Sequence, residues 1–326
     1  MLSTLFTLAL SSVSLVAALP VDIHVRQSVG FTTDFPDPSV IFVDGTWYTF
    51  ASQSGHDNQG IRVQLAQSTD FVTWTLQEGY DAMPTLPPWA SPTREVWAPD
   101  INRLADGTFI LYFSAGSAAN PGKHCVGTAR SPSVRGPFIP DPSVFDCNIA
   151  AGGSIDASGF ADTDGTRYVV WKLDGNSLGH GGPCGNSIAP VVSTPIVIQQ
   201  VAADGATKIG AQSTLIANDP IDGPDVEGPA MIKNAGSYVL FFSSNCYSTP
   251  LYDTSYAYSS SPTGGFVKSD LPLFVTGDLG MTGPGGVDVT VDGARMVMHS
   301  LQPDGRRVLR TTSIGLQVGE GKVRIN

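Results

Sequence analysis

Short strand-like segments recur along the chain as pairs joined by a glycine-containing turn. In each pair the second segment is apolar and aromatic, and Asp-Gly occupies the turn in four of the five copies. Asp-Gly between apolar runs favours a β-hairpin, because a type I′ turn needs positive φ at both central residues. The five copies are VIFVDGTWYTFAS (40–52), INRLADGTFILYFSA (101–115), GFADTDGTRYVVWK (159–172), AMIKNAGSYVLFFSS (230–244) and VDVTVDGARMVMHS (287–300).

The spacing of these hairpins indicates the architecture. Successive turn glycines lie 62, 58, 71 and 57 residues apart, which leaves room for two further strands after each hairpin. Five four-stranded units that close into a ring form a five-bladed β-propeller. We therefore predict an all-β, single-domain propeller over residues 31–326, with a β-sandwich as the alternative. The turn glycines are Gly45, Gly107, Gly165, Gly236 and Gly293.

Composition narrows the class of protein. The 326 residues include 36 Gly and 24 Pro but only 14% charged residues, against roughly 25% in an average soluble domain. A coiled coil or a disordered chain would need more charge, and collagen would need glycine at every third residue. The net charge of −11 argues against nucleic acid or an anionic membrane as a partner, so we expect an uncharged ligand and a monomer.

The N-terminus and the cysteines indicate secretion. Residues 1–19 are predicted to be a signal peptide and residues 20–30 a short pro-segment or linker, with a membrane anchor as the alternative for the apolar run. Four cysteines in a secreted chain suggest two disulfides, for which three pairings exist. The more local pairing joins Cys125 to Cys147 and leaves Cys184 for Cys246. The chain has no CxxC pair, so the cysteines do not predict a metal site.

Acidic residues precede several of the hairpins, where the innermost strand of a blade would line the central channel. Asp37, Asp156 and Glu227 lie 8, 9 and 9 residues before their turn glycines, and Asp100 and Asp288 lie somewhat closer to theirs. Carboxylates that converge in an apolar channel separate in pKa, so that one acts as a base and another as an acid. Cleavage of a glycosidic bond requires such a pair. The alternative is that these acids only cap turns, as an Asp-Pro step often does.

Four segments together resemble glycoside hydrolase family 43: FPDPSVIFVDGTWYTFAS, REVWAPDI, GSIDASGFADTDGTRYVVWK and DVEGPAMIKNAGSYVLFFSSN. The resemblance spans about residues 35–300. It implies a five-bladed propeller that hydrolyses arabinose- or xylose-containing plant polysaccharides with inversion. It also implies that Asp37 is the general base, that Glu227 is the general acid, and that Asp156 orients this acid and raises its pKa.

The chain departs from the family pattern in the fifth blade. The family often has His where this chain has Gly286, in GPGGV (283–287), and that His is associated with a cation in the channel. The departure argues against a channel calcium, so no metal or other cofactor is predicted. For contacts with the sugar we select Phe35, Trp97, Trp89, Arg295 and His299, with core packing as the alternative for Trp97 and a buried structural role for His299.

These observations favour a secreted inverting glycosidase whose partner is a plant polysaccharide or oligosaccharide. An α-L-arabinofuranosidase or arabinanase is the preferred interpretation, and a β-xylosidase of the same family is the nearest alternative. A non-catalytic propeller lectin is the alternative from another class, although a lectin needs no paired acid and base.

Overall fold

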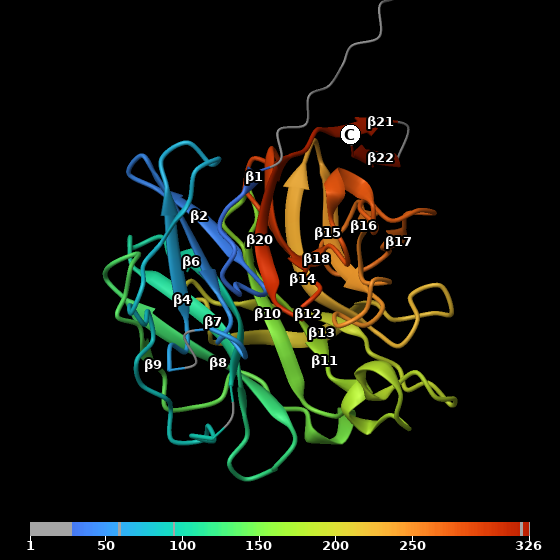
Figure 1. Cartoon of the computed structure of the whole chain (residues 1–326), viewed down its shortest axis with the longest axis horizontal. Helices are drawn as coiled ribbons and strands as arrows, with labels where there is room; N and C mark the ends of the chain where they lie inside the picture. The colour runs from blue at the N-terminus through green and yellow to red at the C-terminus, as the bar shows by residue number, and fades with distance from the viewer. Residues whose placement is uncertain (1–27, 58–59, 94, 320–321, 326) are drawn as a thin grey trace, which may run out of the picture.

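The structure is a computed structural model that describes residues 28–57, 60–93, 95–319 and 322–325. Five four-stranded antiparallel sheets surround a common centre, so the predicted five-bladed β-propeller is confirmed (Figure 1). Within the described ranges, no helix is long and apolar enough to cross a membrane. The predicted signal peptide, residues 1–19, lies outside the described residues.

Blades one to four each follow the order of the chain from the innermost strand outward. Blade one contains β2 (Ser39–Val43), β3 (Thr46–Ala51), β4 (Gln64–Ser68) and β5 (Thr75–Leu76). Blade two contains β6 (Val96–Arg103), β7 (Phe109–Gly116), β8 (His124–Ser131) and β9 (Ile139–Pro140). Blade three contains β10 (Ser154–Ala161), β11 (Arg167–Leu173), β12 (Ile196–Val201) and β13 (Lys208–Ile216). Blade four contains β14 (Val226–Asn234), β15 (Ser237–Ser244), β16 (Asp253–Ser259) and β17 (Val267–Lys268).

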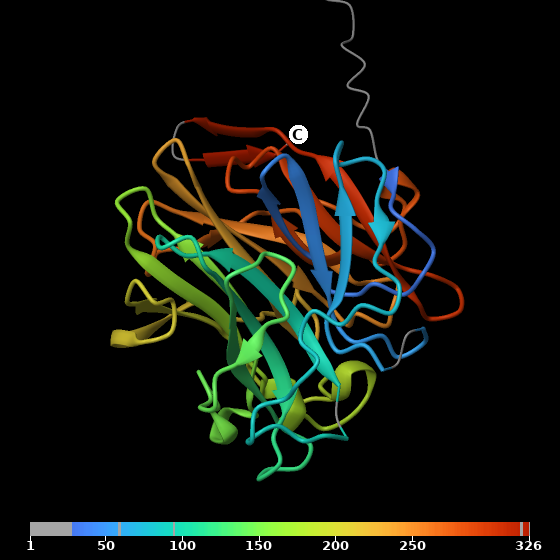
Figure 2. The same cartoon turned by 90° about the vertical axis from the view of Figure 1, so that its left-hand side faces the viewer.

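Blade five joins the two ends of the chain. Its strands are β18 (Gly285–Val289), β19 (Arg295–Leu301) and β20 (Arg307–Ser313), and β1 (Ser28–Val29) pairs with β20 as the fourth. Ser28 and Val29 fall within the segment predicted as a pro-segment or linker (20–30), and they pair with blade five. An added hairpin of β21 (Leu316–Gly319) and β22 (Lys322–Ile325) lies at the edge of the ring (Figure 2).

In the described part of the chain, four short 3-10 helices lie in the loops between these strands. They are η1 (Ile149–Ala151), η2 (Gly175–Leu178), η3 (Pro183–Gly185) and η4 (Asp278–Gly280).

All five predicted hairpins form, but only two have the expected turn. In blades one and four both central residues have positive φ, as in Asp44 (48°) and Gly45 (82°). In blade two the connection is longer: Leu104 and Thr108 are hydrogen-bonded, and of the turn residues between them only Gly107 has positive φ. Asp-Gly therefore predicted the place of the turn and not its type, because the length of the connection also selects the turn.

The core lies between adjacent blades. Phe50 and Leu65 of blade one and Phe113 of blade two are fully buried in one cluster, and a similar cluster joins blades three and four. The second strand of each blade is apolar because blades cover it on both faces; all eight residues of β7 are buried. This packing fixes the blades around the axis and so fixes where their innermost strands end.

A β-bulge interrupts the innermost strand in blades two to five. The pairing with the second strand shifts between Trp97 and Asp100, between Ile155 and Ser158, between Glu227 and Ala230, and between Gly285 and Asp288. The first bulge residue in each blade has positive φ, and in blade one a residue with positive φ stands just before β2. These five equivalent positions are Asp37, Ala98, Asp156, Gly228 and Gly286. Bulges commonly redirect side chains next to active sites.

Candidate active site

A single cleft of about 790 Å³ gathers the three acids selected from the sequence. Asp37 comes from blade one, Asp156 from blade three and Glu227 from blade four, and all three line this cleft. Converging side chains from separate blades are what the channel end of a propeller provides. The predicted convergence of the three carboxylates is therefore present in the structure.

The three acids do not occupy equivalent positions, although their offsets from the turn glycines are almost the same. Asp37 and Asp156 are the left-handed residues of their blades, with φ of 52° and 56°. In blade four this position is taken by Gly228, so Glu227 lies one residue earlier, opposite Ser243. Counting from the turn glycine hides this difference because the hairpin connections differ in length.

A ring of hydrogen bonds ties each blade to the next at this level. In four cases, a side chain at the end of the second strand accepts a hydrogen bond from the backbone N–H of the left-handed residue in the following blade. The pairs are Ala98 N to Ser52 Oγ (2.7 Å), Asp156 N to Ser114 Oγ (2.9 Å), Gly286 N to Ser243 Oγ (2.9 Å) and Asp37 N to His299 Nδ1 (3.1 Å).

The fifth link of this ring is different. Lys172 occupies the equivalent position in blade three, where it pairs with Ile155. The N–H of Gly228 donates instead to Asp156 Oδ2 at 3.1 Å. Asp156 therefore holds the backbone immediately after Glu227, which gives a physical basis for an orienting role.

Asp37 is surrounded by donors. Ser52 Oγ donates to its Oδ2 at 2.6 Å, and Arg307 Nη1 contacts its Oδ1 at 3.0 Å. His299 accepts from the backbone N–H of Asp37, and burial together with the charge of Arg307 lowers the pKa of His299 well below its usual value. His299 is therefore neutral, and it fixes the backbone at a residue with unfavourable φ.

Asp156 and Glu227 differ in their surroundings. Burial and the neighbouring Glu227 raise the pKa of Asp156 well above its usual range, so Asp156 tends to keep its proton. Glu227 receives donors at both oxygens: Lys172 Nζ lies 2.8 Å from Oε2, and the hydroxyl of Tyr252 lies 2.9 Å from Oε1. Burial raises the pKa of Tyr252 well above normal, so this phenol remains a donor.

The arrangement has the chemical parts of acid–base catalysis: a carboxylate held by a guanidinium on one side, and a second carboxyl beside a third acid that keeps its proton. The comparison of sequences then decides the family. Residues 29–316 match the model of Glycosyl hydrolases family 43. The chain belongs to this family. Its members are inverting glycoside hydrolases that act on O-glycosyl bonds.

Individual relatives are more distant. The chain is 28% identical over 114 residues to the extracellular endo-α-(1→5)-L-arabinanase of Thermotoga petrophila. The matched segment covers 31% of this chain and 22% of that protein. The chain is also 25% identical over 245 residues to the β-D-galactofuranosidase xynD of Aspergillus niger, covering 71% and 63%. The matched segments thus span less than two thirds of either relative. A thermostable family-43 glycoside hydrolase of known structure superposes with a TM-score of 0.74, at 25% identity, over 91% of this chain and 94% of the other.

Of the aromatic residues selected from the sequence, only Trp97 lines the cleft of this family 43 protein. Its ring stacks on His124, with the centroids 3.7 Å apart. This stacking leaves the indole partly exposed and fixes its orientation. Such a surface is suited to one face of a sugar ring.

Three of the residues selected for sugar contact do not line the cleft. Phe35 is fully buried in the core cluster that includes Trp47, so it cannot stack on a sugar. Trp89 packs parallel to Phe113, because Gly127 leaves room for its ring. The guanidinium of Arg295 lies 4.9 Å from the ring of Trp47. These corrections share a cause, since sequence position does not show which face of a blade a side chain occupies.

His299 also does not line the cleft, and it contacts the backbone of Asp37 instead of a sugar. The alternative reading of a buried, hydrogen-bonded histidine describes its place. Its ring also explains the family departure at Gly286: a Cβ at that position would lie 2.6 Å from His299 Cε1 and 3.1 Å from Asp37 Oδ1. No larger side chain fits there.

The absence of a channel cation stays a prediction, although the side chain that the family pattern associates with the cation does not fit at this position. A histidine cannot occupy position 286, and in the described part of the chain no three His, Cys, Asp or Glu residues form a metal-ligating group. Asp100 and Asp288 both line the cleft; burial raises the pKa of both, that of Asp288 to about 6. The charge of Asp288 also raises the pKa of Asp100.

Both predicted disulfides, Cys125–Cys147 and Cys184–Cys246, are present. The second one shapes the cleft, because it joins the loop that carries η2 and η3 to blade four. Cys184 and Tyr247, the neighbour of Cys246, both line the cleft. Asn176 and Gly185 of this loop also line the cleft.

Sequence reasoning missed Lys172 and Tyr252, which contact Glu227, and Arg307, which contacts Asp37. Lys172 carried a detectable signal. In the five repeats, the residues at its position are Ser52, Ser114, Lys172, Ser243 and His299, so one strongly charged residue interrupts a set of small or neutral ones. Arg307 and Tyr252 lie outside the repeated hairpin, and no pattern marks them.

Proposed function

We propose that this chain is an inverting glycoside hydrolase that cleaves arabinose-containing plant polysaccharides, as an α-L-arabinofuranosidase or arabinanase. The observation that carries the proposal is the shared cleft: Asp37 and Glu227 face it from different blades, and each is held by its own set of donors. Two carboxyl groups on opposite sides of a glycosidic bond are the requirement for inversion.

In the proposed reaction Asp37 is the general base. It takes a proton from water while the water oxygen attacks the anomeric carbon. Glu227 gives its proton to the glycosidic oxygen as the bond between that oxygen and the anomeric carbon breaks. Asp156 keeps the backbone after Glu227 in place through Gly228. For the water to fit, the two carboxyl groups must be about 6.5–9.5 Å apart.

The relatives support a furanose as the sugar. One is named a β-D-galactofuranosidase. The other is an α-(1→5)-L-arabinanase, and an arabinose linked through O5 cannot have O5 in its ring, so it must be a furanose. This favours arabinofuranosides over the pyranose substrates of a β-xylosidase. Secretion is part of the proposal and is supported by the two disulfides and by the extracellular location in the arabinanase's name.

The test is turnover of aryl α-L-arabinofuranosides, aryl β-D-xylosides and linear arabinan by the purified protein. We expect activity on arabinose-containing substrates, and proton NMR should show that the first product has the opposite anomeric configuration. Asp37→Asn and Glu227→Gln should each lose at least about 100-fold in kcat. Asp141→Asn, which alters a pair with Arg130 at the outer part of blade two, should keep wild-type rates.

Three other outcomes would overturn the proposal. Turnover of xylosides alone would establish the β-xylosidase alternative. Binding of the oligosaccharides without turnover would indicate a lectin. Retention of wild-type rates in both acid variants would show that the residues are wrongly assigned.

A further inference from the structure

Lys172 is a buried cation in contact with the proposed general acid, and the fold does not require a cation at this position. In the other four blades the equivalent side chain accepts a backbone hydrogen bond from the next blade. A protonated lysine has no lone pair and cannot do this. The N–H of Gly228 is satisfied by Asp156 instead, which leaves Lys172 to make other contacts.

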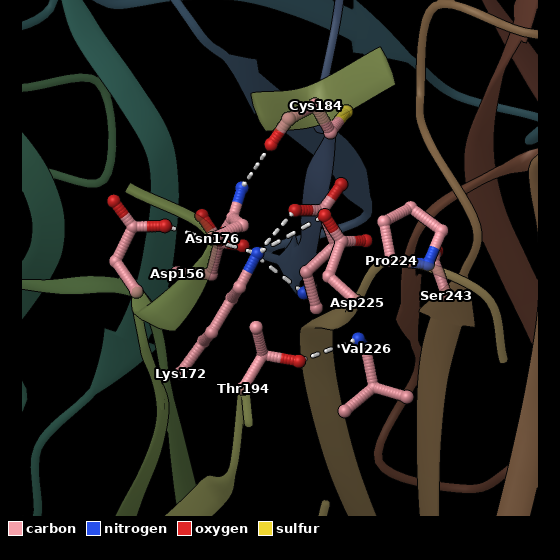
Figure 3. A network of polar contacts seen from close by, with 12 residues as sticks. Asp156, Lys172, Asn176, Cys184, Thr194, Pro224, Asp225, Val226 and Ser243 are labelled. Carbon is pink, nitrogen blue, oxygen red and sulfur yellow. Dashed lines mark hydrogen bonds and ion pairs between the residues drawn. The ribbon is translucent and has the colours of Figure 1, made fainter. Parts of the chain in front are cut away.

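The ammonium group of Lys172 lies among carboxylates from three segments of the chain. Its Nζ is 2.8 Å from Glu227 Oε2, 3.7 Å from Asp225 Oδ2 and 3.9 Å from Asp174 Oδ1, and its side chain has no exposed surface. Asp156 of β10 also contributes to raising the pKa of Lys172. Figure 3 shows Lys172 extending between Asp156 and Asp225.

Asp225 has an unusual environment for a carboxyl group. Its side chain is fully buried, and within the described residues neither of its oxygens has a hydrogen-bond partner. The backbone around it is fixed, since Thr194 accepts from the N–H of Val226 and Asn186 donates to the carbonyl of Pro224. Burying a carboxyl group that has no hydrogen-bond partner is unfavourable. The position of Asp225 beside Lys172 therefore requires an explanation other than hydrogen bonding.

The charges of this cluster follow from its burial. Burial alone would lower the pKa of Lys172, but Asp225, Glu227 and Asp174 together raise it above the usual value, so the lysine is charged. Burial raises the pKa of Asp225 to about 8 and also raises that of Asp174, against the opposing effect of Lys172. Lys172 therefore stays positively charged, and the neighbouring carboxyl groups all interact with this one charge.

We propose that Lys172 is a positioning residue that fixes the carboxyl group of Glu227 and stabilises the carboxylate left after proton donation, while Asp225 and Asp174 hold the lysine in place. This inference rests on the proposed function, in which Glu227 is the general acid. A fixed cation acts most strongly where negative charge develops, because the site is preorganised. Lys172 does not line the cleft, so it acts through Glu227 and not on the sugar.

The first test follows the protonation of Glu227 directly and needs no activity. The sequence contains four glutamates, Glu78, Glu95, Glu227 and Glu320, so carbon-13 labelling of the glutamate carboxyl group gives few NMR signals. The signal that disappears in Glu227→Gln is that of Glu227, and its titration is then measured in each variant.

We expect Lys172→Met to move the titration midpoint of Glu227 upward by about one pH unit or more, because an opposite charge at contact distance favours the ionised form. Loss of one partner from a buried ion pair can prevent folding. The double variant Lys172→Met/Asp225→Asn removes the buried carboxylate as well, and it should show the same shift.

Lys233→Met is the matched control. It removes a lysine of β14 that pairs with Asp162 at 2.6 Å, outside the cleft lining, and it changes the net charge equally. The Glu227 midpoint should not move in this variant. An unchanged midpoint in the folded double variant, or an equal shift in Lys233→Met, would overturn the inference.

Kinetics give a second readout. In the folded variants that lack Lys172, the alkaline limb of kcat/KM should move upward with the NMR midpoint. The loss should be at least about tenfold greater for phenyl than for 2,4-dinitrophenyl arabinofuranoside, since a poor leaving group needs the acid more. Equal losses with an unmoved limb would show a merely structural lysine. If the wild type hydrolyses nothing, the proposed function fails, while the NMR titration still decides the role of Lys172.

Discussion

Asp156 accepts a hydrogen bond through Oδ2 from the backbone N–H of Gly228, at 3.1 Å, and so one proposed catalytic carboxyl holds the residue that follows another. The contact crosses from blade three to blade four. It replaces the link that a side chain of the second strand makes in the other blades. The position of Glu227 therefore depends on Asp156 as well as on its own strand.

This contact predicts a graded effect of substitutions at Asp156. Asparagine keeps an acceptor for the Gly228 N–H, and glycine removes it, while both tolerate the positive φ of 56°. We expect kcat to fall in both variants, and to fall about tenfold further in Asp156→Gly than in Asp156→Asn, with similar KM. Steady-state kinetics on an aryl arabinofuranoside measure the difference; equal kcat values would show that the hydrogen bond has no effect.

Trp97 should contribute to substrate binding and not to the chemical step. Its partly exposed ring lines the cleft, whereas Trp89 packs on Phe113 away from it. We expect Trp97→Ala to raise KM about tenfold, equivalent to about 1.4 kcal/mol, with kcat within about threefold of wild type. Trp89→Phe should change thermal stability and leave KM unaltered. A rise of KM in the second variant alone would contradict the assignment.

The stability of the fold should depend on pH through Asp225. The pKa of this carboxyl is about 8 in the folded protein, because of burial, against about 3.9 in an unfolded chain. The folded state therefore binds more protons between these values, and the contribution of Asp225 to stability is lost as pH rises from about 4 to 8.

Asp225→Asn removes this dependence. Its Tm relative to that of the wild type should rise steadily between pH 5 and pH 8, as measured by scanning calorimetry in buffers of equal ionic strength. Asp141→Asn, at a carboxyl that is one-third exposed, serves as the control and should show a constant difference. A constant difference for Asp225→Asn would mean that this carboxyl titrates normally.

The Cys184–Cys246 disulfide should matter for both stability and substrate affinity. It spans 62 residues, and closing a loop of this length stabilises a protein by about 4 kcal/mol in the chain-entropy model. The Cys184→Ser/Cys246→Ser variant should unfold at lower denaturant concentration and should also show a raised KM, because the loop it anchors forms one wall of the cleft.

The other disulfide provides the comparison. Neither Cys125 nor Cys147 lines the cleft, and they span only 22 residues. Cys125→Ser/Cys147→Ser should lower stability by about 3 kcal/mol without a change in KM. If both double variants raised KM equally, general loosening of the fold would explain the effect.

The sequence by itself determined the repeating unit, and with it the number of blades. Asp-Gly and Ala-Gly turns between apolar runs are local signals, and their spacing reports how many strands each unit holds. The carboxyl groups of Asp37, Asp156 and Glu227 were found for the same reason, since they precede those turns. The cysteines allowed three pairings, and the structure contains the one in which Cys125 bonds the nearby Cys147.

The tertiary structure decided how side chains from different blades meet. Phe35, Trp89 and Arg295 looked suitable for a sugar, but Phe35 is buried and the other two pack on aromatic rings outside the cleft lining, because the packing between blades determines which face is covered. Lys172 and Arg307 reach acids in the neighbouring blade, 55 and 270 residues away in the chain. Such contacts depend on the closure of the ring and on the bulges, and neither leaves a periodic pattern in the sequence.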